Sequence, residues 1–278
     1  MTWNIQWGLG VDRRLDLARV VGEARRIADF DVLCLQEVAD NFPELAGSRG
    51  EDQFAEIARL LPGYTAVEGA ALDIPDEAGR RKRFGNMILS RYPVGQILRY
   101  TLPWEAAPTN NMPRMLVEAV VMAPFGPLRV MTTHLEYSSG TLRAAQVAGI
   151  REAHRTACAR FANPRKAGQG TYAVHPTSPS ALLTGDFNMT PDDPTKLRVS
   201  APFDDGTPRL VDAWTALKPD VTHPPSFCVF DQTYGLPHCC DFVFLTEDLA
   251  ARLKTVSYDV NTQVSDHQPV VVELDASA

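Results

Sequence analysis

Five apolar segments of this sequence each carry, at one end, polar side chains that are costly to bury. These side chains are Asn4, Glu37, His134, Asp186 with Asn188, and Asp266 with His267. A single residue of this kind is usually a helix cap, a turn former or a solvated group. Five repeats of one pattern instead favour convergence on one pocket, because loops at strand ends are where α/β proteins assemble their sites.

The residue types in this set favour a hard cation with oxygen ligands. Acidic residues without Cys or His at close zinc-ligand spacing favour Mg²⁺ or Mn²⁺ over zinc. Asparagines and histidines beside such a metal are donors suited to phosphate oxygens. A metal with donors aimed at developing negative charge is the apparatus of phosphoryl transfer to water. The sequence shows neither a P-loop nor a dinucleotide-binding glycine pattern, which argues against ATP or NAD.

Apolar and alternating runs predict the strands that position these side chains. They cover residues 2–6, 31–38, 85–90, 115–122, 128–135, 181–188, 241–245, 255–260 and 269–274. Apolar residues at helical spacing predict helices over about residues 12–29, 52–61 and 141–161. Residues 163–180 are rich in Pro, Gly, Ser and Thr and predict a surface loop. Strands and helices interleave without a clean break, so we expect one domain over residues 1–278.

Composition and charge limit the classes of function. No apolar run approaches the roughly 20 residues needed to cross a bilayer. The start of the chain lacks the basic and apolar regions of a secretory signal, so we expect a cytoplasmic protein and favour a monomer. Five cysteines, an odd number without tight spacing, predict reduced thiols. The net charge of −7 argues against broad nonspecific binding to nucleic acid.

The ordered set of motifs resembles the endonuclease/exonuclease/phosphatase superfamily, the fold of deoxyribonuclease I, exonuclease III and the neutral sphingomyelinases. The motifs are "TWNIQWG", "LQEV", "GNMILSRYP", "TTHLE", "GDFN", "CDFVF" and "SDHQPV", and they run from residue 2 to about residue 274. "GDFN" followed by "SDH" about 80 residues later is the most specific part. The resemblance implies an α/β fold in which two mixed β-sheets pack together with helices on their outer faces, a four-layer sandwich like that of deoxyribonuclease I.

The resemblance also implies roles for the acidic and amide side chains. Glu37 is expected to be the principal ligand of Mg²⁺ or Mn²⁺, with Asn4 and Asp266 near the same ion or its waters. Asp186 is expected to orient and deprotonate the attacking water, and Asn188 to hydrogen-bond the phosphoryl oxygens. In-line attack needs nucleophile, metal and leaving group on one axis, which explains why the residues come from many strands.

Further roles concern the histidines and their neighbours. The resemblance implies that His134 donates to the phosphate and that His267 stabilises the transition state or acts as acid or base, held by Asp241. Asp241 is flanked by cysteines and apolar residues, so we expect a buried carboxylate that needs such a partner. Asn86, in "FGNMILS", matches a family position near the substrate phosphate, although a turn residue would look the same.

One stretch departs from the family pattern. The family often has a basic residue shortly before the acid of "CDFVF", whereas this chain reads "GLPHCCDFVF". His238, Cys239 and Cys240 raise the idea of a soft-metal site, but three adjacent residues do not easily wrap one ion. We interpret the stretch as a variation on the substrate side.

The substrate class depends on a run of basic residues. "GRRKRFGN" places Arg80 to Arg83 just before Asn86, so we expect a basic loop at the rim of the site, in which Arg81 and Arg83 bind substrate. Such a run is as often only a solvated loop. A clamp for a second phosphate would favour a polyanion such as nucleic acid or a phosphoinositide. Arg143, near the start of the helix after His134, is a further candidate.

We therefore expect hydrolysis of a phosphodiester, nuclease-like on nucleic acid. The alternative is a phosphatase or phospholipase-type hydrolase acting on an inositol phosphate, a phospholipid or a small phosphoester. No stretch interleaves aromatic with basic residues as a platform for single strands. A non-catalytic scaffold is less favoured, because it would typically have lost Glu37, Asp186, Asn188 or His267, and all four are present.

Overall fold

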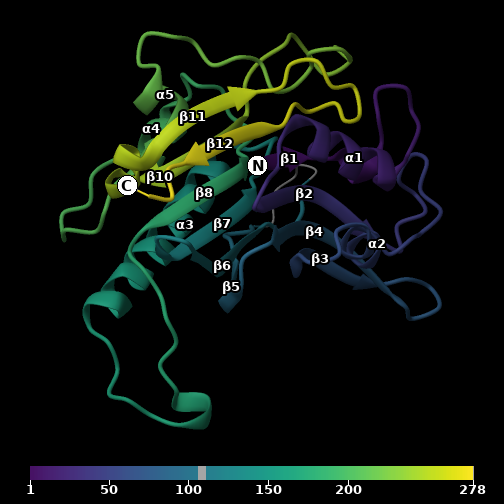
Figure 1. The fold of residues 1–278 in the computed structure, drawn as a ribbon. Helices are drawn as coiled ribbons and strands as arrows, with labels where there is room; N and C mark the ends of the chain where they lie inside the picture. Colours follow the sequence, from purple (N-terminus) through teal and green to yellow (C-terminus); the bar gives the residue numbers. More distant parts are fainter. Residues whose placement is uncertain (106–110, 278) are drawn as a thin grey trace.

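Two six-stranded mixed β-sheets pack face to face in the computed structural model, which describes residues 1–105 and 111–277 (Figure 1). Apolar side chains of both sheets form the core between them, including Cys34 and Ile88 from the first sheet and Val117 and Val130 from the second. Helices cover the two outer faces, where each sheet buries a second apolar surface. The four-layer sandwich expected from the sequence is confirmed.

The first sheet contains the strands that carry Asn4 and Glu37. Its order is β11 (Leu253–Tyr258), β12 (Val270–Leu274), β1 (Thr2–Asn4), β2 (Val32–Asp40), β4 (Arg81–Ser90) and β3 (Thr65–Pro75). β1 and β2 run parallel, and their register places Asn4 beside Gln36. Asn4 and Glu37 therefore lie at the same end of the sheet.

The second sheet contains the strands that carry His134, Asp186 and Asp241. Its order is β5 (Val94–Thr101), β6 (Met115–Ala123), β7 (Gly126–His134), β8 (Ala181–Asp186), β10 (Asp241–Thr246) and β9 (Leu210–Asp212). The parallel register of β7 with β8 pairs His134 with Asp186. The antiparallel register of β8 with β10 pairs Asp186 with Asp241. Three polar residues thus lie side by side across the sheet.

Three longer helices form the outer layers. α1 (Leu17–Ile27) and α2 (Gln53–Leu60) pack on the first sheet, and α3 (Gly140–Ala162) packs on the second. Asp16, Asp52 and Ser139 cap these helices, each accepting a backbone N–H in the first turn. The other helical segments are short: η1 (Gln6–Gly8), η2 (Gly170–Tyr172), α4 (Pro194–Val199), α5 (Ala213–Leu217) and η3 (Glu247–Arg252).

All strands expected from apolar runs are present, but β3, β5 and β9 are not predicted from the sequence. Each of the three is an edge strand. Most side chains of β3 and β5 are half-buried or exposed, so these strands lack the apolar pattern of the interior ones. The helix expected from residue 12 begins only at Leu17, because Asp16 caps it and Arg13 has a φ of +63°. α4 and α5 are too short to show helical periodicity.

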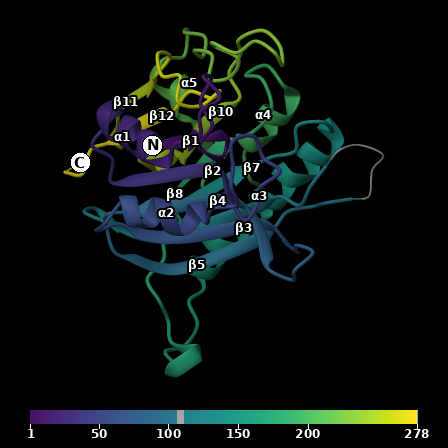
Figure 2. The same ribbon diagram turned by 90° about the vertical axis from the view of Figure 1, so that its right-hand side faces the viewer.

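The remaining expectations concern the surface and the thiols. Residues 163–180 form an exposed loop that extends past the sheets and helices in both views (Figures 1 and 2). All five cysteines are free and buried. Across residues 1–105 and 111–277, no helix combines the length and apolar composition that crossing a bilayer requires.

Candidate active site

The side chains at the strand ends meet at one end of the interface between the two sheets. Asn4 links the sheets, because its Nδ2 donates to Glu37 Oε1 (3.1 Å) on one side and to Asp186 Oδ2 (3.0 Å) on the other. Its own Oδ1 accepts the backbone N–H of Gln6 (3.1 Å). Asn4 thus holds the two acids in place, and its side-chain oxygen Oδ1 is engaged by the Gln6 N–H.

Two of the acidic or amide residues have strained backbones. Glu37 has a φ of +60° and lies where the register of β2 against β4 shifts between Leu35 and Val38. Asn188 has a φ of +49°. A β-bulge re-aims a side chain, and positive φ in a non-glycine residue is a cost that persists at functional sites. The Asn188 backbone N–H also donates to Asp186 Oδ1 (2.8 Å), which ties the two residues together.

His267 is held against Asp241 in a buried pair. Its Nδ1 lies 2.9 Å from Asp241 Oδ2, which makes Nδ1 the donor and directs Nε2 toward Asp186 Oδ2, 3.7 Å away. Burial opposes a charged imidazole, but the carboxylates of Asp241 and Asp186 outweigh it and raise the pKa of His267 well above its ordinary value. The Phe227 ring packs against the imidazole at a tilt of 30° with centroids 4.4 Å apart, and Trp3 Nε1 donates to the His267 carbonyl (2.9 Å).

Ser226 and Phe227 were not predicted as site residues, although they brace this pair. The Ser226 hydroxyl oxygen accepts the backbone N–H groups of Cys240 (3.0 Å) and Asp241 (3.1 Å). The backbone of Phe227 forms β-bridges with both His238 and His267. "PPSFCV" carries no pattern that marks these roles, since they depend on contacts with distant segments.

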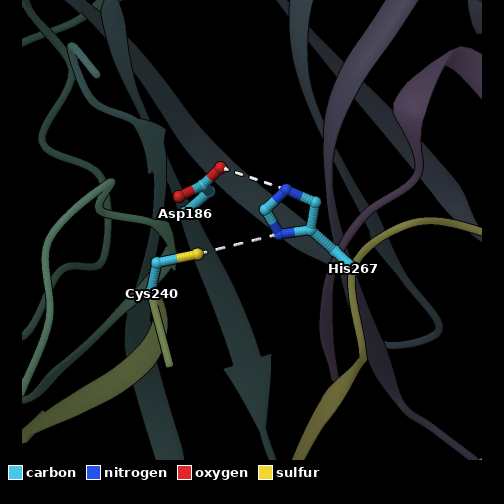
Figure 3. A group of neighbouring side chains, drawn as sticks. All are labelled: Asp186, Cys240 and His267. Carbon is cyan, nitrogen blue, oxygen red and sulfur yellow. Dashed lines mark hydrogen bonds and ion pairs between the residues drawn. The ribbon is translucent and has the colours of Figure 1, made fainter. Parts of the chain in front are cut away.

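Of the three adjacent residues considered as a soft-metal site, only Cys240 belongs to a group of possible ligand atoms among the described residues, and it groups with Asp186 and His267. Figure 3 shows Cys240 and Asp186 on the same side of the His267 ring, both facing it. The three ligand atoms lie within 4.8 Å of one another. The Cys240 Sγ lies 3.9 Å from His267 Nδ1, the nitrogen already bound to Asp241. Burial raises the pKa of the Cys240 thiol well above its ordinary value, so it stays protonated. We therefore assign Cys240 to the support of the His267–Asp241 pair.

The acids of the site are electrostatically crowded. Burial and the charge of Asp266 raise the pKa of Glu37 to about 7, and burial raises the pKa of Asp266. Burial also opposes ionisation of Asp186, but His267 and the Asn188 N–H outweigh it and lower the pKa of Asp186. Carboxylates held together in this way favour a bound cation, and their hard oxygen donors suit Mg²⁺ or Mn²⁺. Glu37 and Asp266 are the residues that fit this role.

A pocket of about 700 Å³ opens over these residues. Of the residues singled out from the sequence, it is lined by Glu37, His134, Arg143, Asp186, Asn188, His238, Asp266 and His267. Asn4 and Asp241 lie behind this lining. Asn86 is buried, its Nδ2 donates to the Met115 carbonyl (3.1 Å), and it is not among the residues that line the pocket.

The expected basic loop at the rim is wrong, because β4 begins at Arg81 and the basic side chains bind carboxylates. Arg81 Nε lies 2.7 Å from Asp73, and Arg83 lies 2.8 Å from Asp40 and 2.6 Å from Glu68. Arg80 and Lys82 pair with Asp76 and Glu44 in the same way. Neither Arg81 nor Arg83 lines the pocket, so the structure does not support a clamp there.

Two other arginines do line the pocket. Arg143 donates to the Glu136 carbonyl (2.9 Å) and to Asp193 (3.3 Å). Arg114, which was not predicted, is only 4% exposed, and its Nε and Nη1 have no hydrogen-bond partner among the described residues. Burial and the charge of Arg114 lower the pKa of His134 to about 3. Arg114 directly precedes the apolar run of β6, so the strand-end pattern that marked the other residues applies to it too.

Comparisons with known proteins agree with this geometry. The family model described as "Endonuclease/Exonuclease/phosphatase family" matches residues 1–267, so the chain belongs to that family. Members of the family are hydrolases that act on phosphoesters and generally use divalent metal ions. A search of curated protein sequences gives no match.

Several solved structures share the fold. An endonuclease/exonuclease/phosphatase from Beutenbergia cavernae is 24% identical, with a TM-score of 0.64 over 99% of this chain and 70% of that one. A mannosyl-6-phosphatase from Bacteroides thetaiotaomicron is 17% identical (TM-score 0.62; 98% and 97% covered). A 3'-5' exonuclease from Neisseria meningitidis is 19% identical (TM-score 0.60; 99% and 98% covered). At these identities the likeness concerns the fold alone.

Proposed function

We propose that this protein hydrolyses a phosphodiester of nucleic acid with Mg²⁺ or Mn²⁺, by in-line attack of an activated water. The observation that carries the proposal is the convergence of four acids, three histidines and two arginines on one pocket. The bound cation would be held by Glu37 and Asp266. It would offset the negative charge of the phosphoryl group and leaving oxygen.

The side chains of the pocket have separate roles in the proposed reaction. Asp186, ionised and held by Asn4 and Asn188, orients the water and accepts its proton. His267 faces the pocket through Nε2 as a charged donor, fixed in that orientation by Asp241. His134, kept neutral by burial and Arg114, offers a hydrogen bond without a charge that would compete for the carboxylates. Donors set in advance around the phosphoryl group stabilise the charge of the transition state.

A second candidate is a phosphatase acting on a small phosphomonoester. Two observations favour it: the basic residues that would hold a second phosphate at β4 are already paired, and Arg114 brings an unpaired guanidinium to the pocket. A terminal phosphate carries one more negative charge than a diester, which an additional buried cation would match.

Turnover of bis-p-nitrophenyl phosphate with Mg²⁺ or Mn²⁺ tests the proposed reaction. We expect metal-dependent turnover that falls by about 10²- to 10⁴-fold in Asp186→Asn, the loss typical of a removed acid–base group. Absence of turnover across metals and substrates, with Asp186→Asn indistinguishable from the wild type, would refute it. Comparison with p-nitrophenyl phosphate, duplex DNA, abasic DNA, RNA, inositol phosphates and sphingomyelin then ranks the substrate classes. A preference for the monoester would favour the second candidate.

A further inference from the structure

The loop between α3 and β8 stands away from the rest of the molecule. We call residues 163–180 the basic arm; Figures 1 and 2 both show it extending past the sheets and helices. Residues 164–177 make no hydrogen bond to any other part of the chain that the structure describes. Their own backbone bonds run from Tyr172 to Gln169 and from Ala173 to Gly170. The arm is thus free of the body except at its base.

The base of the arm is fixed by a buried arginine. Arg129 is fully buried, and it donates to the carbonyls of Ser178 (2.7 Å) and Pro179 (3.2 Å), where the arm returns to the sheet. The same guanidinium contacts His154 of α3 (2.6 Å) and Glu118 of β6 (3.3 Å). Buried polar groups that are satisfied by several partners hold one geometry. The arm therefore leaves the body from a rigid point.

The charge of this region differs from that of the whole chain. No Asp or Glu occurs between Ala153 and Gly185, although the protein carries a net charge of −7. The arm's own cations, Arg165 and Lys166, are exposed, and neither forms an ion pair within the described part of the chain. Uncompensated cations on an acidic protein attract polyanions rather than the protein's own surface.

The basic arm also carries an exposed aromatic ring. Tyr172 is 73% exposed, and Gly168 lies so close to it that a side chain at position 168 would clash with the Tyr172 backbone and Cβ. The turn after Lys166 therefore brings Gly168, two residues beyond Lys166, against the backbone of Tyr172. In the sequence the cations and the tyrosine are separated by five residues, which hides the basic–aromatic combination.

We propose that the basic arm binds single-stranded nucleic acid at a site separate from the pocket. Exposed cations that neutralise phosphates, together with an exposed aromatic face on which a base can stack, are the means by which proteins hold single strands. A lipid surface fits the arm less well, because Tyr172 and Val174 are the only large apolar residues in residues 163–180.

The arm and the pocket lie at opposite ends of α3. Arg143, near the start of the helix, lines the pocket, whereas Ala162 ends the helix at the arm. A helix of 23 residues is about 34 Å long. The arm thus acts by retaining a polymer close to the enzyme, which raises the local concentration of its phosphoesters at the pocket. Binding by the arm does not depend on the reaction proposed for the pocket.

The test measures binding of a fluorescein-labelled 20-nucleotide oligo(dT) by anisotropy across a salt series, with EDTA present to prevent cleavage. We expect the Arg165→Ala/Lys166→Ala variant to bind about tenfold more weakly. The slope of log K against log salt should fall by about 1.4, because two phosphate contacts are lost. Tyr172→Ala should weaken binding without changing the slope, and Tyr172→Trp should retain it.

The matched control removes two exposed cations from the helices on the first sheet. Arg25→Ala/Arg59→Ala changes the net charge equally, so an effect of general charge would appear in both double variants. Thermal melting establishes that all variants are folded. Equal affinity of the arm variant and the wild type, or equal losses in both double variants, would overturn the proposal. Loss of binding to phosphatidylserine-containing vesicles with unchanged oligonucleotide affinity would overturn it in favour of a lipid surface.

Discussion

The pocket and the start of β4 both gather charged side chains, but they compensate the charges differently. In the pocket, Glu37 and Asp266 have no arginine or lysine partner among the described residues, and Arg114 has two nitrogens without any partner. At the start of β4, each basic side chain of Arg80–Arg83 binds a carboxylate. In the pocket, some buried charges have no ion-pair partner among the described residues, whereas each basic side chain at the start of β4 is paired near the surface.

This difference decides which charged side chains are available to bind a ligand. A charge already paired within the protein must break that pair before it contacts a substrate. A buried charge without a partner costs folding free energy, and a ligand of opposite sign recovers that cost on binding. Proteins keep such costs mainly where function requires them. The four predictions below test this contrast.

The largest effect is expected at the His267–Asp241 pair. His267→Ala should lower kcat by about 10³-fold, because the charged donor of the pocket is lost. His223 offers a matched control, since its Nε2 forms a similarly buried contact with Asp212 (2.8 Å) outside the pocket. His223→Ala should lower the melting temperature and leave kcat unchanged. Equal losses of turnover in the two variants would contradict the distinction between the pocket and other buried charges.

The second-largest effect concerns how the free energy of unfolding of the metal-free protein changes with pH. The pKa of Glu37 is raised from 4.5 to about 7, so the folded state holds this proton more tightly than the unfolded state does. The resulting stability is fully present below pH 4.5 and is lost as the pH rises through 7. Urea unfolding in EDTA should show a loss of up to about 3 kcal/mol over this range. Glu37→Gln should remove most of that loss. If the unfolding free energy of this variant instead falls with pH in parallel with that of the wild type, the acids of the pocket do not raise the pKa of Glu37.

Substitution of Arg114 should lower activity without lowering the stability of the fold. Arg114→Met should lower kcat/KM by about 10- to 100-fold, as expected for loss of hydrogen bonds to a charged group, while the melting temperature stays equal or rises. Arg129→Met is the comparison, because Arg129 is equally buried but fully partnered, and it should destabilise the fold strongly. A clear drop in the melting temperature of Arg114→Met would indicate that Arg114 is a structural residue.

The smallest effect is expected at β4. Arg83→Gln should cost about 1 kcal/mol of unfolding free energy through its lost ion pairs. Neither this variant nor Arg81→Gln should change KM for an oligonucleotide or a small diester, because both side chains are engaged by carboxylates. A rise in KM for the oligonucleotide but not for the small diester would instead support the phosphate clamp expected from the sequence.

Much of the fold and of the candidate site follows from local patterns. Interior strands are apolar along their length, so β2, β6, β7, β8 and β10 are visible in the sequence, and their polar ends mark Glu37, His134 and Asp186. The side chains of β3 and β5 are mostly half-buried or exposed, and β9 has only three residues, which is why these three strands escape prediction. Arg114 fits the strand-end pattern, but a basic residue before a strand is usually solvated, so the sequence alone does not indicate that it is a site residue.

Sequence alone determined which chemical groups stand at the strand ends and the order of the strands that carry them, because both are encoded within a few residues. Tertiary structure decided which charges remain uncompensated. The partners of Arg83 come from Asp40, 43 residues before it, and from Glu68 on the neighbouring strand. Arg165 and Lys166 resemble that run in composition, but neither forms an ion pair within residues 1–105 and 111–277. Coulombic pairing depends on distances between segments far apart in the chain, and only the packed sheets set those distances.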